Sequence, residues 1–140
     1  MTVATKEMLI GQELPSLRKE ISIDRMRLYA AWGNRNIHTD WDVAAKAGLP
    51  APLAPGMMLY DYVSEMLTNF FGQEWLKGGK LSVSFIHYVV PGEVITTKGT
   101  IREKMPEDNA LRMNVEIWCE NQRGERVAVG TASSLVPSVT

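Results

Sequence analysis

The chain has 140 residues, of which 45% are hydrophobic and 22% are charged, the composition of an ordinary globular protein of one domain. Fifteen basic residues against sixteen acidic ones leave a net charge of -1 without a basic block, which excludes nucleic acid as the expected partner. No apolar stretch is long enough for a membrane helix, and a single cysteine, Cys119, excludes an internal disulfide and a cysteine-based metal cluster. We therefore expect a protein of the reducing cytoplasm, not associated with a membrane.

The first third of the chain is predicted to hold a lead-in, a strand and a helix. Residues 1–13 are expected to be poorly ordered, and residues 14–140 to form a single domain. Residues 14–22 are a candidate strand. An amphipathic helix is predicted over residues 23–32, with Gly33 as its C-terminal cap. The side chains of this helix that are expected in the core are Ile23, Met26, Leu28, Tyr29 and Trp32.

A polar loop of sequence NRNIHT, residues 34–39, holds His38. Asn residues favour turns because their side chains bond neighbouring backbone groups, so this loop can orient the imidazole. Asp40 precedes a short helical run and is predicted to cap its N-terminus, and Gly48 is predicted to end it. Three prolines then make residues 49–55 a stiff, extended strap.

A long, largely buried helix is predicted over residues 57–71, with Gly56 at its start. A helix start presents unpaired N–H groups and the positive end of the helix dipole. An oxyanion that forms during a reaction would be stabilised there. The polar side chains that share one stripe of this helix are Asp61, Ser64, Glu65 and Thr68. Within this stripe, Ser64 either bonds the carbonyl one turn back or serves the site.

After this helix, the hydrophobic pattern changes to the two-residue period of strands. Strands are predicted over residues 81–90, 94–103, 111–120 and 125–136, with turns between them. His87 shares a face with apolar residues of the first of these strands. We therefore expect it to be a satisfied core or interface histidine rather than a second base.

A long apolar helix followed by hairpin-linked strands predicts an α+β fold, in which an antiparallel β-sheet is wrapped around a central α-helix. A single sheet of this kind has free edges and an apolar rim. A second subunit would cover both, so we expect at least a dimer.

The segments around His38 and Gly56 resemble the (R)-specific enoyl-CoA hydratases and MaoC-like dehydratases. The motif of that family runs roughly G-D-x-N-P-[LIV]-H-x-D and continues with A-H-G-M at the start of a long helix. Here residues 32–40 read WGNRNIHTD, and residues 54–57 read APGM. The similarity extends from about Gly11 to Val136, nearly the whole chain. It implies the hotdog fold, which agrees with the pattern of predicted elements.

The resemblance places three catalytic residues. His38 matches the catalytic histidine of the family, Gly56 matches its oxyanion glycine, and Ser64 matches its helix serine. Taken without the resemblance, His38 would more simply be a loop imidazole bonded to the backbone. The match, together with the fixed spacing to Gly56, favours the functional interpretation.

The resemblance also shows where this chain departs from the family. The acid of the family motif, five residues before the histidine, falls on Gly33, which has no side chain. Arg35 and Asn36 replace its Asn and Pro, and Pro55 replaces the His of A-H-G-M. The residues expected to contact the substrate are Gly33, Arg35, Asn36 and Met57.

The activity that the resemblance implies is that of a hydratase or dehydratase in fatty acid metabolism, acting on an α,β-unsaturated or 3-hydroxy acyl thioester of CoA or acyl carrier protein. His38 would act in turn as base and acid, while the Gly56 N–H holds the thioester oxygen. An unperturbed imidazole titrates near about pH 6.5, so we expect neither a metal nor another cofactor. Either His38 works with an ordered water alone, or Asp61, Glu65, a partner subunit or the substrate supplies the group that Gly33 lacks.

Two alternatives remain open at this point. The chain could be a non-catalytic hotdog subunit that completes the acyl pocket of a heteromeric hydratase, as the missing acid at Gly33 would allow. The retained His38 counts against this. It could also be a hotdog thioesterase, if a carboxylate or a water nucleophile lies beside the Gly56 helix start. We therefore expect the chain to form a homodimer or a hetero-oligomer with another hotdog subunit.

Overall fold

The computed structural model describes residues 3–30 and 34–136, and its centre is a five-stranded antiparallel sheet in the order β1-β3-β4-β5-β2. The strands are β1 (Leu17–Glu20), β2 (Lys80–Phe85), β3 (Val94–Glu107), β4 (Ala110–Glu120) and β5 (Arg126–Leu135). The helices are α1 (Ile23–Tyr29), α2 (Trp41–Lys46), α3 (Gly56–Phe71) and α4 (Gln73–Gly78). The edges of the sheet are therefore β1 and β2, the two strands closest to the helical segments in the sequence.

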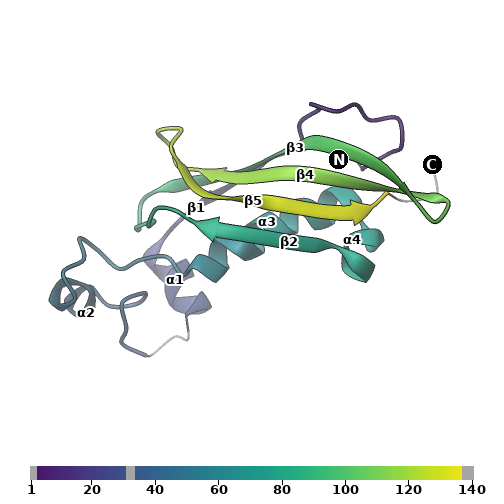
Figure 1. Cartoon of the computed structure of the whole chain (residues 1–140). Helices are drawn as coiled ribbons and strands as arrows, with labels where there is room; N and C mark the ends of the chain where they lie inside the picture. Colours follow the sequence, from purple (N-terminus) through teal and green to yellow (C-terminus); the bar gives the residue numbers. More distant parts are fainter. Residues whose placement is uncertain (1–2, 31–33, 137–140) are drawn as a thin grey trace.

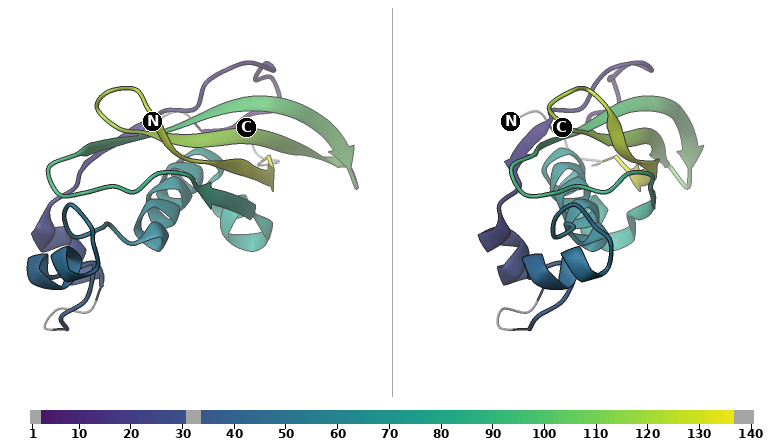
Figure 2. Two further views of the ribbon diagram at one scale, coloured as in Figure 1. Left: turned by 60° about the vertical axis from the view of Figure 1, so that its left-hand side comes forward. Right: turned by 90° about the vertical axis from the view of Figure 1, so that its left-hand side faces the viewer.

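The sheet curves over α3, which lies along one of its faces, with α4 beside it (Figure 1). Helices α1 and α2 gather beyond one end of the sheet, at the end where α3 begins (Figures 1 and 2). Within the described residues, none of the helices has the length and apolar character needed to cross a membrane.

Helix α3 forms because its apolar residues recur every three or four positions, which gives it one continuous face for burial. The buried members are Met58, Leu59, Val63, Met66, Leu67, Phe70 and Phe71. Each fully buried side chain of this size stabilises the fold by about 1.5–3 kcal/mol. Gly72, at a φ of 68°, ends the helix in a conformation that glycine adopts most readily, as predicted.

The sheet face that meets α3 follows the predicted two-residue period. In β4, the alternate residues Met113, Val115, Ile117 and Cys119 are buried. Burial raises the pKa of the Cys119 thiol to about 12, so this single cysteine is an inert core residue in the native protein. The predicted sheet wrapped around a central helix is therefore confirmed.

Residues 3–13 contain little regular secondary structure but contact both the core and the sheet. Ala4 and Met8 are buried, and the Ala4 N–H donates to the Phe70 carbonyl at the end of α3. The Gly11 N–H donates to the carbonyl of Ile101 in β3. These contacts close the end of the core that lies far from the start of α3.

The first predicted strand and helix are both longer than the observed ones. The strand predicted over residues 14–22 is regular only in β1, because Pro15 has no N–H with which to continue the ladder. Helix α1 ends at Tyr29 rather than at residue 32, and Ala30 already has a non-helical ψ of 35°. Leu28, predicted in the core, is 72% exposed, and Tyr29 is also exposed. The predicted cap, Gly33, and Trp32 lie outside the described residues.

Three further boundaries differ from the prediction. Strand β2 ends at Phe85 instead of residue 90, because the N–H groups of Ile86 and His87 both donate to the carbonyl of Val127 and so interrupt the ladder. The turn predicted at residues 105–109 is shorter, with only Asp108 and Asn109 at positive φ. Helix α4 was missed, because its sequence QEWLKG is short and ends in glycines that favour a turn.

Candidate active site

The His38 loop is held by short local hydrogen bonds. The His38 backbone N–H donates to Asn36 Oδ1 at 2.8 Å, and the Asn36 N–H donates to Thr39 Oγ1 at 3.0 Å. The His38 ring bonds the Leu53 carbonyl through Nδ1 at 2.8 Å. A carbonyl can only accept, so Nδ1 carries the proton and Nε2 of the neutral ring is left as the acceptor. The loop therefore fixes the backbone of His38, and the Leu53 carbonyl, outside the loop, holds its ring.

Asp40 closes this loop and caps α2, as the sequence predicts. Its carboxylate accepts a hydrogen bond from the Val43 N–H at 3.0 Å and forms an ion pair with Arg35 Nε at 2.9 Å. Chiefly through the hydrogen bond from Arg35, and secondarily through that from Val43, the pKa of Asp40 falls to about 2. A carboxylate held in the ionised form by these partners has a structural task and is a poor proton donor.

The strap of residues 49–55 connects the His38 loop to the segment that follows β2. On one side, the Leu53 N–H donates to the Ile37 carbonyl at 2.9 Å. On the other side, the Ala54 N–H donates to the Val89 carbonyl at 2.8 Å. Because prolines restrict this strap, both bonds hold their neighbours in fixed positions.

Helix α3 begins at Gly56, directly after Pro55. Proline has no side-chain acceptor, so Pro55 cannot cap the first N–H groups of the helix as Ser, Asp or Asn would. These N–H groups and the helix dipole favour negative charge at this end. The ring of Phe85 packs against Gly56 so closely that a Cβ at residue 56 would lie 2.9 Å from the ring atoms Cδ2 and Cε2.

A pocket of about 420 Å³ brings these pieces together. His38 and Gly56, distant by 18 positions in the sequence, both line it. Its remaining polar side chains are those of His87 and Tyr88. Its apolar lining consists of Leu53, Ala54, Leu59, Phe85, Ile86 and Val89. An imidazole and a helix start among apolar walls provide for proton transfer and for stabilisation of an oxyanion.

Of the other residues predicted for the site, those that the structure describes lie outside the lining of this pocket. Ser64 lies about two turns further along α3, where its Oγ accepts a bond from Trp75 Nε1 at 3.2 Å rather than donating to the preceding turn. Arg35 is largely exposed and paired with Asp40. Asn36 contacts the backbone of His38 instead of lining the pocket, and Met57 is exposed on the first turn of α3. Gly33 lies outside the described residues.

The two carboxylates of the α3 stripe have partners on neighbouring elements. Asp61 accepts a hydrogen bond from the Tyr29 hydroxyl at 2.6 Å, and Glu65 forms an ion pair with Lys19 at 2.9 Å. Partial removal of the Tyr29 hydroxyl from water, followed by the bond to Asp61, raises the pKa of Tyr29 to about 12. Both carboxylates therefore tie α3 to α1 and β1, and neither lines the His38 pocket.

His87 is predicted to be a satisfied core or interface histidine, and of these the core position is wrong, whereas the interface position stays a prediction. Since β2 ends at Phe85, His87 leaves the alternation of the strand and is exposed instead of buried. It lines the same pocket as His38. Sequence reasoning missed it because the alternating pattern continues past the end of the hydrogen-bonded ladder, although Pro91 and Gly92 indicate a turn shortly after.

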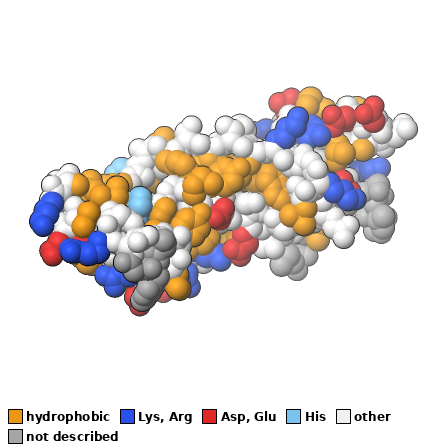
Figure 3. Space-filling view, turned by 90° about the horizontal axis from the view of Figure 1, so that it is seen from below, with side chains coloured by type: hydrophobic (Ala, Val, Ile, Leu, Met, Phe, Trp, Pro, Cys, Tyr) orange, Lys and Arg blue, Asp and Glu red, His pale blue; other side chains and the backbone are white. Residues whose placement is uncertain are grey.

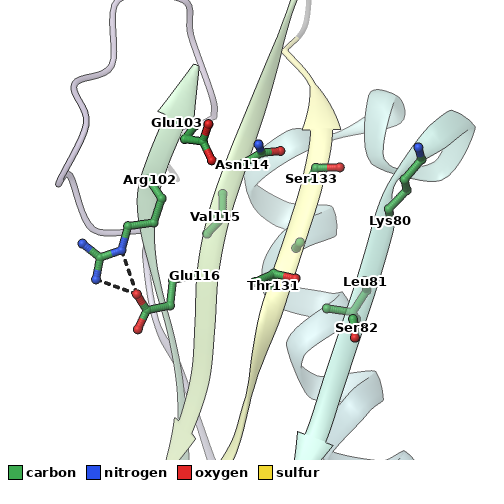
Figure 4. A pocket seen from close by; sticks show the side chains of 11 residues that line it. Lys80, Leu81, Ser82, Arg102, Glu103, Asn114, Val115, Glu116, Thr131 and Ser133 are labelled. Carbon is green, nitrogen blue, oxygen red and sulfur yellow. Dashed lines mark hydrogen bonds and ion pairs between the residues drawn. The ribbon is translucent and has the colours of Figure 1, made fainter. Parts of the chain in front are cut away.

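A larger cavity, of about 710 Å³, lies on the opposite, outer face of the sheet (Figure 4). Hydroxyl and amide side chains from β2, β4 and β5 line it, and Arg102 is paired with Glu116 at its border, with Nε and Oε2 2.7 Å apart. Neither histidine lines this cavity, and the start of α3 is on the other face of the sheet. We therefore place the candidate active site in the smaller pocket. Among the described residues, no three His, Cys, Asp or Glu side chains gather closely enough to hold a metal ion.

Known structures have the same fold. The R-hydratase PhaJ1 from Pseudomonas aeruginosa is 24% identical, with a TM-score of 0.78 over 94% of this chain and 83% of that one. The (R)-hydratase from A. caviae is 22% identical, with a TM-score of 0.76 over 95% of this chain and 100% of that one. The HadBC 3R-hydroxyacyl-ACP dehydratase complex from Mycobacterium tuberculosis is 17% identical, with a TM-score of 0.72 over 94% of this chain and 99% of that one.

These likenesses confirm the predicted hotdog fold of the α+β class. No curated protein matches the chain in sequence. The family described as MaoC like domain, however, matches residues 6–120, which include the His38 loop, the strap and all of α3. The chain is therefore a member of the MaoC-like dehydratase family, with a hotdog fold.

Proposed function

We propose that this protein is a hydro-lyase that adds water to an α,β-unsaturated acyl thioester, or removes water from a 3-hydroxy acyl thioester. The observation that carries the proposal is the meeting of His38 and the Gly56 helix start in one apolar pocket. Membership of a hydratase and dehydratase family supports the same reaction class.

His38 Nε2 would take a proton from water as the water oxygen attacks the β-carbon. The electrons of the double bond would move to the thioester oxygen, where the Gly56 N–H and the dipole of α3 stabilise the charge. The apolar walls would hold the acyl chain, and their modest volume favours a short one. The thioester carrier, CoA or acyl carrier protein, would lie outside the pocket, where Met57 and Arg35 are exposed.

A second hotdog subunit is part of the proposal. Met57, Phe85, Ile86 and Tyr88 are all exposed around the pocket and form an unusual gathering of large apolar side chains. Figure 3 shows hydrophobic side chains spreading over the same face as the two imidazoles. Strand β2 also leaves an edge of the sheet unpaired within the described chain. A homodimer or a hetero-oligomer would cover both features.

The alternative of a non-catalytic subunit has one observation in its favour, the glycine at position 33 where the family has an acid. The HadBC complex, which has this fold, assembles from two kinds of subunit. We rank it second because a subunit without catalytic function would not need the fixed tautomer of His38 beside a helix start. A thioesterase remains the third candidate, and product analysis separates it from both.

The test is an assay of the purified chain, expressed alone, with enoyl-CoA thioesters of several chain lengths. Hydration is measured as the loss of the conjugated double bond. Thioester hydrolysis is measured as the release of free thiol. We expect hydration, and we expect His38→Ala to lower kcat by about 10²-fold or more, the usual effect of a positioned acid or base. Ser82→Ala, on the outer face of the sheet, is the matched control and should keep full activity.

Full activity in His38→Ala would refute the mechanism. An inactive chain that gains activity only with a second hotdog subunit would favour the non-catalytic alternative. Release of free thiol without hydration would favour the thioesterase.

A further inference from the structure

The His38 pocket contains a second imidazole, that of His87, which has no task in the reaction described above. His87 lines the same pocket, although 49 positions separate it from His38 in the sequence. These are the two histidines of the chain, and Figure 3 shows both imidazoles close together on one face, beside hydrophobic side chains.

The His87 ring is mounted in the same way as that of His38. Its Nδ1 bonds the Tyr88 carbonyl at 2.7 Å, and a carbonyl can only accept, so Nδ1 carries the proton. Nε2 is thus the nitrogen left for exchange in both rings. The His87 ring also packs edge-on against the Tyr88 ring, with centroids 4.8 Å apart, which restricts its rotation.

The backbone beneath His87 is fixed on two sides. The N–H groups of Ile86 and His87 donate to the Val127 carbonyl in β5, at 3.0 and 3.2 Å. Two residues later, the Val89 carbonyl accepts from the Ala54 N–H of the strap. The next strap residue, Leu53, holds the His38 ring. One proline-restricted segment therefore bonds the His38 ring directly and holds the backbone two residues beyond His87.

The neighbours of His87 leave its ring beside the pocket. It packs against the Tyr88 ring, and it lines the same pocket as His38. The Glu125 carboxyl, near the start of β5, has its pKa lowered mainly by its bond from Arg123, then by Asn121, with a minor contribution from the charge of His87.

We propose that His87 is the second proton-transfer group of this pocket and takes the task for which position 33 has no side chain. This inference rests on the proposed hydro-lyase function. It also assigns separate tasks to the two rings, since a neutral imidazole accepts a proton and an imidazolium donates one.

In hydration, His38 Nε2 accepts a proton from water while the water oxygen bonds the β-carbon. The double-bond electrons move to the thioester oxygen, which the Gly56 N–H stabilises. The electrons then return from the thioester oxygen to the α-carbon, and this carbon takes the Nε2 proton of the His87 imidazolium. His38 finishes protonated and His87 neutral, and transfer of one proton between them through solvent restores the starting state. One water has then been added, and dehydration is the same sequence in reverse.

The experiment compares His87→Ala and His87→Gln with the wild-type chain, using the enoyl-CoA that the wild type hydrates best. We expect kcat to fall by about 10²-fold with KM nearly unchanged, because the loss concerns proton transfer and not binding. Added imidazole should restore part of the kcat of His87→Ala. His87→Gln retains a similar size and a hydrogen-bonding amide but cannot exchange the proton, so it should be as slow as His87→Ala. Melting temperatures confirm that both variants fold.

Wild-type kcat in either variant would overturn the inference while leaving the proposed function intact. A loss of kcat that imidazole does not relieve and that comes with a lower melting temperature would reduce His87 to a structural residue, and would also overturn it. If the wild-type chain hydrates none of the thioesters, and is thus no more active than His38→Ala, the proposed function on which the inference rests is refuted instead.

Discussion

The Phe85 ring covers Gly56 so tightly that a Cβ at residue 56 would lie 2.9 Å from two ring atoms. Real Cβ atoms do not approach this closely, so any side chain at residue 56 must displace the ring or the helix start. Two separate requirements therefore favour glycine here, namely contact with Phe85 and close approach of a substrate to the backbone N–H.

These two requirements can be separated by substitution. We expect Gly56→Ala to lower hydration by about 10²-fold, because the added Cβ keeps the thioester oxygen away from the backbone N–H, an effect on the scale of losing an oxyanion donor. Phe85→Ala alone should reduce binding of the acyl chain, because an apolar wall is lost. If Gly56 serves the oxyanion, the double variant Gly56→Ala/Phe85→Ala stays as slow as Gly56→Ala. Recovery of kcat in the double variant would mean that only the clash with Phe85 mattered.

A carboxylate at position 33 tests the departure from the family motif. We expect Gly33→Asp to raise hydration of a simple enoyl-CoA, because the motif places an acid five residues before His38. The gain should be larger in the His87→Ala background, where a second proton-transfer group is missing. Melting temperatures are measured alongside, so that a loss of stability is told apart from a change in the chemistry. A folded variant without any gain would support the partner-subunit alternative.

Acid should weaken the His38 loop through Asp40. The pKa of this carboxyl is lowered to about 2 by Arg35 and by the Val43 N–H, whereas an Asp in the unfolded chain titrates near about 3.9. The ionised form therefore stabilises the native state above about pH 4, and this contribution is lost as the pH falls towards 2.

Two substitutions at Asp40 show which part of this contribution is electrostatic. Asp40→Asn keeps a capping oxygen but removes the charge. This variant should therefore have a lower melting temperature than the wild type at neutral pH, and the two should converge as the pH falls from about 4 towards 2. Asp40→Ala removes the capping oxygen as well. It should therefore stay less stable than the wild type both at neutral pH and at the acid end of the range. Thermal unfolding across the pH range provides the comparison. A constant difference between Asp40→Asn and wild type would contradict the assigned role of the charge.

Shortening a buried side chain of α3 should destabilise the protein. Leu67 of α3 is fully buried, and Leu67→Ala should cost about 2–5 kcal/mol through lost burial and the cavity left behind. The matched control is Leu76→Ala in α4, which removes the same atoms from a side chain that is 73% exposed and should change stability by less than about 0.5 kcal/mol. Denaturant unfolding measures both values. Equal effects would place Leu76 in an interface between subunits.

The sequence by itself determined the elements whose signals are local. The periodicity of α3, the cap at Asp40, the stop at Gly72 and the alternation in β4 each depend on residues within a few positions of one another, and all are present in the structure. The family motif likewise located His38 and Gly56, because it is a contiguous pattern.

The tertiary structure alone decided which residues share the pocket. His87 continues an alternating pattern in the sequence, but the Val127 carbonyl in β5 ends its ladder and the strap residue Ala54 fixes the chain beyond it, which turns the ring to the pocket instead of the core. Ser64, which the motif places at the site, accepts a bond from the indole N–H of Trp75, a residue of a helix too short to predict. Both outcomes depend on hydrogen bonds between residues distant in sequence, and such bonds leave no periodic signal in the chain.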